Sequence, residues 1–183
     1  MPVLEQRSKG LYCPAADAWI DPSGPVNRAL ITHAHADHAR PGCEEYWAVN
    51  QSEGVLRQRL GRGINLHSVA YGEPHKLGQA NVSFHSAGHV LGSAQIRIEV
   101  AGEIWLVTGD YKRCHDPSCT PFETVNCDVL ITESTFGLPI YRWKTGQEIA
   151  NEIYGWWSEE RQHPSILFCY AFGKAQRKLA ELK

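Results

Sequence analysis

The segment HAHADH at residues 33–38 constrains this chain most, because it places four metal-ligand side chains within six residues. It follows the apolar run ALI at residues 29–31 after a single threonine, so we expect it at the end of a strand. Histidine and aspartate supply nitrogen and oxygen donors that suit Zn²⁺ or a similar cation. In extended backbone His33 and His35 point the same way, whereas Asp37 and His38 are free to face a neighbouring centre. The pattern therefore predicts two metal ions.

Two further ligands are predicted downstream, each at the end of a strand-like run. Residues 82–84 lead towards His89, and the apolar run 104–107 delivers Asp110 at its carboxyl end, where open α/β sheets gather their functional loops. Alone, His89 is typical of a structural histidine, and an aspartate after glycine is typical of a turn. Together with the six-residue cluster, both are predicted to bind metal.

The order of these motifs resembles the metallo-β-lactamase fold superfamily, and residues 29–110 carry the resemblance. The strand-like run 129–131 opens into Glu-Ser-Thr-Phe, which resembles the first motif of the β-CASP nucleases. Residues 167–176 resemble the strand, glycine turn and helix that begin the inserted domain of that branch. Residues 10–22 and 136–141 resemble the bacterial ligase-associated DNA exonuclease group.

The resemblance implies an α/β fold of two parts. Residues 1–140 would be the N-terminal portion of a metallo-β-lactamase αββα sandwich. Residues 141–183 would begin the β-CASP inserted α/β domain, which is then truncated.

The resemblance also implies a role for each candidate residue. The six predicted ligands would hold two zinc ions, with Mn²⁺ as the alternative metal: His33, His35 and His89 on the first ion, Asp37 and His38 on the second, and Asp110 bridging both. A water between such ions loses its proton near neutral pH and becomes the nucleophile. Asp37 would orient this water, and Glu133 would support the general acid that protonates the leaving oxygen.

The implied function is a metal-dependent nuclease that hydrolyses phosphodiester bonds through a two-zinc-bridged hydroxide. DNA is the preferred substrate over RNA, and the implied role is that of an exonuclease in DNA repair, with a functional link to a DNA ligase. Two alternatives stay open. One is a small-molecule metallo-hydrolase of the same fold, and the other is a catalytically incomplete binding module.

One departure from the family concerns histidines. In β-CASP proteins the partner of Glu133 and one more ligand of the second metal are histidines beyond the inserted domain, whereas this sequence ends at Lys183. After Asp110 only His115 and His163 occur, and neither lies in a matching motif. We therefore expect an N-terminal fragment or truncated product, with an incomplete second metal site and low activity.

Composition narrows the class of protein. With 183 residues, 43% of them hydrophobic, the chain can bury one sizeable core. It has no long apolar stretch, and its first residues lack the basic and apolar regions of a signal peptide, so we expect a cytoplasmic protein without a membrane span. Six cysteines without paired spacing predict free thiols. The net charge of −2 makes no bulk electrostatic case for nucleic acid, although basic residues group at 57–62, 112–113 and 142–144.

The remaining pattern predicts strands alternating with loops to residue 135, followed by helix. Thr145 and Glu148 form a capping-box pattern, after which apolar side chains from Ile149 to Trp157 fall on one helix side. Pro164 should precede a buried strand at residues 166–168, and residues 174–183 should form a final helix.

Overall fold

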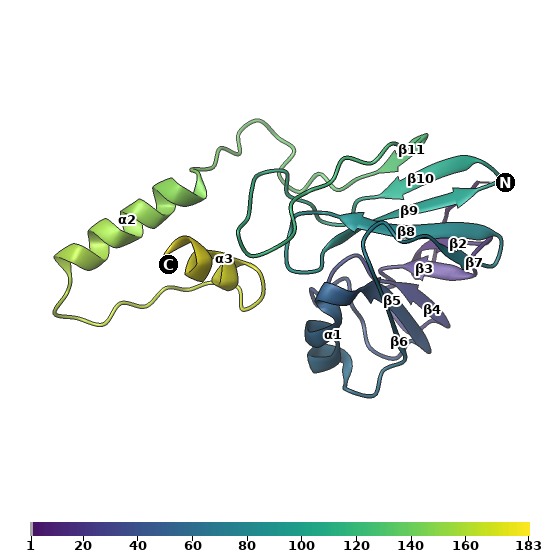
Figure 1. Ribbon diagram of the computed structural model, residues 1–183, viewed down its shortest axis with the longest axis horizontal. Coiled ribbons are helices and arrows are strands. Elements are labelled where there is room, and N and C mark those ends of the chain that lie inside the picture. The colour runs from purple at the N-terminus through teal and green to yellow at the C-terminus, as the bar shows by residue number, and fades with distance from the viewer. Residues whose placement is uncertain (1) are drawn as a thin grey trace.

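Two β-sheets face each other in the computed structural model, which describes residues 2–183 (Figure 1). The six-stranded sheet has the order β1-β2-β3-β4-β5-β6, formed by Glu5–Arg7, Gly10–Cys13, Ala18–Ile20, Arg28–Leu30, Glu45–Val49 and Leu66–Val69. The five-stranded sheet has the order β11-β10-β9-β8-β7, formed by Val129–Ile131, Glu103–Val107, Ala94–Val100, Ala80–Ser86 and His75–Leu77. The predicted α/β sandwich is confirmed.

Alternating side chains divide each sheet into two faces. In β4, Leu30 joins the core between the sheets, whereas its neighbour Ala29 belongs to a second apolar cluster on the opposite face. In β8, Val82 and Phe84 are fully buried in the core between the sheets. This alternation follows from the two-residue period of a strand, and it shows that the six-stranded sheet is covered on both sides.

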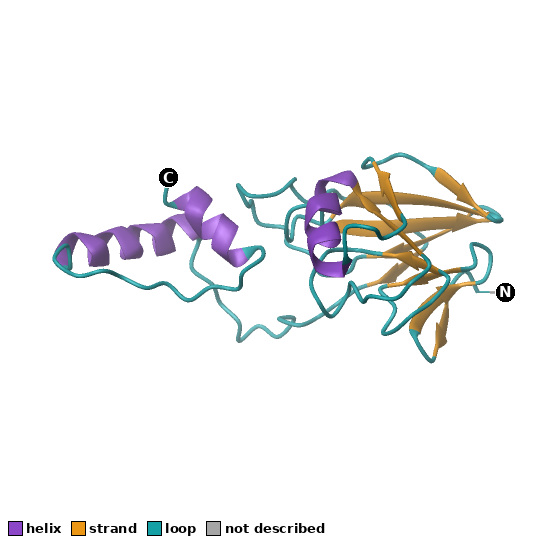
Figure 2. Ribbon diagram, turned by 90° about the horizontal axis from the view of Figure 1, so that it is seen from below, coloured by secondary structure: helices purple, strands orange, loops and turns teal. Residues whose placement is uncertain are grey.

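The outer face of the six-stranded sheet is covered by α1 (Glu53–Leu60), which follows the short 3₁₀ turn Asn50–Ser52. Leu56 of this helix is fully buried and packs with Tyr46 and Ala48 of β5. Figure 2 shows α1 in front of the sheets when the molecule is seen from below. The expectation of strands and loops alone up to residue 135 was therefore wrong at α1, because a single buried leucine in an eight-residue helix leaves almost no helical periodicity to read.

Strand direction brings the candidate residues to one edge of the sandwich. Strands β3 to β6 are parallel, so Asp21 after β3 and the 33–38 segment after β4 emerge at the same edge. In the other sheet β11 is parallel to β10. Strands β10 and β8 each pair antiparallel with β9, so β8 runs in the same direction as β10 and β11. The loops that carry His89, Asp110 and Glu133 therefore also leave from matching strand ends.

The last two helices, α2 (Gly146–Glu159) and α3 (Lys174–Glu181), lie beside the sandwich and pack against each other (Figure 1). The predicted capping box is present, since the Thr145 side chain accepts from the Glu148 backbone and the Glu148 side chain accepts from the Thr145 backbone. Ala150 is fully buried, but Trp156 is exposed. The apolar side of α2 is thus only partly covered in the residues that the structure describes.

The strand predicted at residues 166–168 was wrong. This segment is irregular, and the Phe168 side chain is 91% exposed. A strand needs a neighbour for its backbone hydrogen bonds, and within residues 2–183 none of the strands pairs with this segment. The final helix is confirmed and ends at Glu181.

Two further observations concern the chain as a whole. All six cysteines are free. Over residues 2–183, the helices are too short or too polar to reach across a lipid bilayer.

Candidate metal centre

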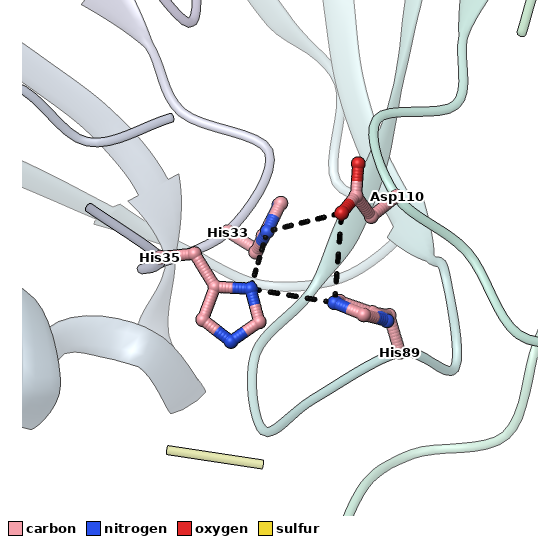
Figure 3. Close-up of side chains that lie close together, drawn as sticks. All are labelled: His33, His35, His89 and Asp110. Atoms are coloured by element: carbon pink, nitrogen blue, oxygen red, sulfur yellow. Dashed lines mark hydrogen bonds and ion pairs between the residues drawn. The ribbon is translucent and has the colours of Figure 1, made fainter. Parts of the chain in front are cut away.

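Four donor atoms converge at the edge of the sandwich, from His33, His35, His89 and Asp110 (Figure 3). All lie within 4.8 Å of one another. The Nδ1 atom of His35 is 2.9 Å from His33 Nε2 and 3.4 Å from His89 Nε2. The Oδ2 atom of Asp110 is 3.9 Å and 3.8 Å from the same two Nε2 atoms. A tetrahedron with Zn–N arms of 2.0–2.1 Å has edges of about 3.3–3.4 Å. The four separations above, of 2.9 to 3.9 Å, scatter around that value, so the group could hold one such ion after small side-chain shifts.

Close backbone approaches hold these loops together. At Gly109, which precedes Asp110, φ is +54°, and an added Cβ would lie 2.6 Å from the Thr32 side chain. At Gly88, before the histidine, φ is +67°, and an added Cβ would lie 2.4 Å from the Lys112 carbonyl oxygen. Only glycine combines this conformation with this proximity, so both residues are needed where the sequence has them.

Two imidazoles of the group, those of His33 and His89, have lowered pKa values, which favours the neutral form that a metal requires. His33 is fully buried, and burial, followed by the charges of the neighbouring histidines, keeps its pKa far below the usual value. Burial likewise lowers the pKa of His89, although Asp110 opposes the shift. The His33 Nδ1 atom lies 3.1 Å from Thr32 Oγ1, which leaves Nε2 directed at the other donors. The side chains of His33 and His89 can therefore each offer a lone pair to a metal ion.

A second, smaller group lies on the other side of Asp110. His38 Nε2 is 3.4 Å from Asp110 Oδ1 and 3.7 Å from Asp37 Oδ2. Each carboxylate oxygen of Asp110 thus faces a different set of donors, which is the arrangement of a bridging ligand. The Asp37 side chain is 74% exposed and opens this second group to solvent.

Sequence reasoning missed Asp21, which orients this second group. Its Oδ2 atom lies 2.8 Å from His38 Nδ1, and its Oδ1 atom accepts the Thr32 N–H at 2.8 Å. Burial acts to lower the pKa of His38, but the hydrogen bond and charge of Asp21, with the charge of Asp110, outweigh it and raise that pKa. A carboxylate behind a ligating histidine is a recurrent feature of metal sites. The available signal was its place after β3, at the edge that also receives the ligands.

Glu133 lines a cleft of about 270 Å³ at the same edge, together with Asp21, Asp37, His38 and Asp110. Its Oε2 atom accepts the Thr135 N–H at 2.8 Å. Burial acts to raise the pKa of Glu133, but the hydrogen bonds from Thr135 outweigh it, so the pKa is lowered. Glu133 is therefore a carboxylate at neutral pH and cannot itself donate a proton.

The later histidines and the basic residues noted in the sequence lie outside the group of candidate metal ligands. In the described part of the chain, neither His115 nor His163 belongs to a donor cluster. His163 lies in the turn that follows α2, where its N–H donates to Glu160. Among the basic residues, Lys112 pairs with Asp116 and Lys144 with Glu152. These two cations already have carboxylate partners.

Comparisons with known proteins give relatives that match between 62% and 100% of this chain. A protein named "Probable DNA ligase" from Opitutus terrae is 32% identical over 188 residues, which cover 100% of this chain and 18% of that protein. The RNase J-like protein of Methanocaldococcus jannaschii is 32% identical over 179 residues, covering 84% of this chain and 42% of that protein. Cleavage and polyadenylation specificity factor subunit 3 of Dictyostelium discoideum is 34% identical over 118 residues, covering 62% of this chain and 15% of that protein.

The chain thus spans less than half the length of each of these three relatives. A scan against protein-family models found no match.

Proposed function

Because this chain belongs to the metallo-β-lactamase fold superfamily and is homologous to its β-CASP nucleases, we propose that it forms the metal-binding part of a nuclease that hydrolyses phosphodiester bonds. The observation that carries the proposal is the convergence of three histidine nitrogens on one side of Asp110 and of two further donors, from Asp37 and His38, on the other. Such a pair of sites suits the charge that develops on phosphate oxygens in an in-line displacement.

The ligand set favours zinc, with Mn²⁺ as the alternative metal. The first ion would take His33, His35, His89 and Asp110, and the second would take Asp37, His38 and Asp110. The second site has three protein donors, so it would bind more weakly than the first. In this proposal residues 1–140 form the metallo-β-lactamase portion and residues 141–183 begin the β-CASP domain.

The side chains have distinct roles in the proposed reaction. When bound, the metal would supply Lewis acidity toward the phosphate and lower the pKa of an attacking water. Asp37 reaches into solvent beside His38, so its carboxylate can orient that water and accept its hydrogen bond. Glu133 is ionised, so it would hold a protonated partner that donates to the leaving oxygen.

We propose DNA as the substrate, with RNA as the alternative. In this proposal the chain acts as a cytoplasmic exonuclease in DNA repair, and the match over the full chain to a "Probable DNA ligase" supports its link to a ligase. The similarity to an RNase J-like protein supports RNA. Labelled single-stranded DNA, duplex DNA and RNA of the same sequence, offered in parallel, distinguish these substrates.

The central test is Asp110→Ala, with Glu44→Gln as the matched control at an exposed carboxylate. We expect Asp110→Ala to lose bound zinc and all hydrolysis while keeping its circular dichroism spectrum, because a ligand is removed but little core. Glu44→Gln should match the wild type. Hydrolysis retained by the Asp110→Ala protein after its metal content has been measured would overturn the proposed centre.

A further inference from the structure

His35 has two ring nitrogens with different surroundings. Its Nδ1 atom is turned towards the donors of His33 and His89, and the other nitrogen points away from them (Figure 3). That second nitrogen, Nε2, lies 3.2 Å from the main-chain carbonyl oxygen of Phe172. Phe172 is 137 residues further along the chain, in the segment between α2 and α3. A ligand from the sandwich thus meets backbone from the C-terminal part of the chain.

The Phe172 ring fixes this segment against the sandwich. The ring meets His35 edge to face, with centroids 5.5 Å apart and planes at 78°. The same ring packs on the apolar cluster that α1 forms with β4 and β5. Phe172 is therefore anchored in the body of the sandwich, although the residues before it, such as Phe168, are exposed.

Gly173 permits the close approach. Its φ is +95°, a conformation that disfavours a side chain. A Cβ at this position would lie 2.5 Å from Val90 Cγ1 and 3.9 Å from His35 Nε2. Any other residue at position 173 would push the turn, and the Phe172 carbonyl with it, away from His35.

A second contact links α3 to another loop at the same edge of the sandwich. Arg177 of α3 lies 3.8 Å from the carboxylate of Asp116, in the loop that follows Asp110. The Asp116 side chain is 4% exposed and also accepts from Lys112 at 3.0 Å. The start of α3 is therefore attached both to a histidine ligand and to the loop of the aspartate ligand.

We propose that the Phe172–Gly173 turn is a positioning element of the metal centre. A neutral imidazole carries one N–H and one lone pair, and a hydrogen bond at one nitrogen decides which atom can bind metal. The Phe172 carbonyl accepts the His35 Nε2–H and so keeps Nδ1 unprotonated and aimed at the other donors. Docking of the C-terminal segment thereby sets the zinc affinity of the first site. This inference rests on the proposed metal centre.

Zinc affinity provides the first test, measured by competition with a chromophoric chelator on the 183-residue chain. We expect Gly173→Ala to raise the dissociation constant about 10-fold or more, the usual range for losing a hydrogen-bond partner of a metal ligand. The control is Gly102→Ala, where φ is +88° but nothing lies within 4 Å of the added Cβ. It carries the same kind of backbone strain without displacing the turn, and its dissociation constant should stay within about twofold of wild type.

The protonation state of His35 provides the second test and needs no variant. In zinc-loaded, ¹⁵N-labelled wild-type protein, long-range ¹H–¹⁵N correlations should show His35 protonated at Nε2, with Nδ1 shifted by the metal. A proton at Nδ1 would overturn the inference, as would Gly173→Ala protein with wild-type zinc affinity. Wild-type zinc affinity in Gly173→Ala protein would leave the metal centre intact, whereas a proton at Nδ1 in zinc-loaded protein would remove only the His35 donor from it. If the wild-type chain instead failed to bind zinc, the proposed centre would fail first, and the positioning role with it.

Discussion

Replacing Asp116 by Asn should destabilise the chain through the contact between α3 and the metal-site loop. The carboxylate accepts the Ser118 N–H at 3.0 Å and the Ser118 hydroxyl at 2.6 Å through Oδ1. Its Oδ2 atom lies 3.0 Å from Lys112 Nζ and 3.8 Å from an Arg177 nitrogen. An amide keeps the shape of this side chain but removes the charge that both cations face.

The magnitude follows from burial. Breaking a buried ion pair typically costs about 3–5 kcal/mol. Here the aspartate is buried, but the Lys112 and Arg177 side chains are 26% and 25% exposed, so water can solvate part of each cation that loses its partner. The Ser118 hydrogen bonds persist, with a neutral acceptor in place of a charged one. We therefore expect the free energy of unfolding to fall by about 2 kcal/mol at pH 7.

The pH dependence of this loss has a definite sign. Burial acts to raise the pKa of Asp116, but the hydrogen bonds from Ser118 and Lys112 outweigh it and hold the pKa below its usual value. A carboxyl group whose folded pKa is depressed stabilises the folded state above its unfolded pKa, which is about 3.9. The difference between wild type and Asp116→Asn should therefore be complete at pH 7. It should shrink as the pH falls below about 4 and vanish below the folded pKa.

Urea unfolding followed by circular dichroism, on metal-free protein from pH 7 to pH 3, measures both features. The matched control is Glu152→Gln, which removes an exposed ion pair with Lys144 and should leave the midpoint unchanged. The reasoning is refuted if Asp116→Asn unfolds at the wild-type urea concentration at pH 7, or if its deficit persists unchanged in acid.

Two other variants probe the second metal site. Asp21→Asn should weaken binding of the second metal about 10- to 100-fold, because it alters the hydrogen bond to His38 Nδ1. Binding of the first ion should stay unchanged. Titration with Co²⁺, followed by absorbance, resolves the two sites. His163→Ala protein should keep one tightly held zinc per chain after mild chelation, as the wild type does, because His163 lies outside the donor cluster. If the wild type instead retained two ions and His163→Ala protein retained one, His163 would be a ligand that completes the second site.

Local pattern was enough to predict most of the candidate ligands. Residues 33–38 carry four of these ligands within six positions. His89 and Asp110 each follow a strand whose apolar run is evident in the sequence. Because parallel strands deliver their carboxyl ends to one edge, the convergence of these loops could be expected as well. Their roles as metal ligands stay a prediction.

The residues that hydrogen-bond to the candidate ligands, Asp21 and Phe172, could not be predicted from local sequence pattern. Asp21 acts through a hydrogen bond whose partner is 17 residues away, and it carries no motif of its own. The Phe172 contribution is a backbone carbonyl, which every residue has, so only the folded chain distinguishes it. The false strand at residues 166–168 has a related cause, since an apolar run predicts a strand only if a neighbour exists to pair with it.

The long separation between His35 and Phe172 bears on the order in which the centre assembles. Within the first donor group, His35 meets His89 across 54 residues, whereas it meets Phe172 across 137. Loop-closure entropy grows as the logarithm of loop length, so the longer closure costs only about 0.8 kcal/mol more, which is within reach of one hydrogen bond. During synthesis, however, the four donors emerge from the ribosome well before residue 172. The proposed centre can thus bring its four donors together first and be joined by the Phe172–Gly173 turn last. In that order, docking of the turn would be the step that converts a weakly bound ion into a tightly bound one.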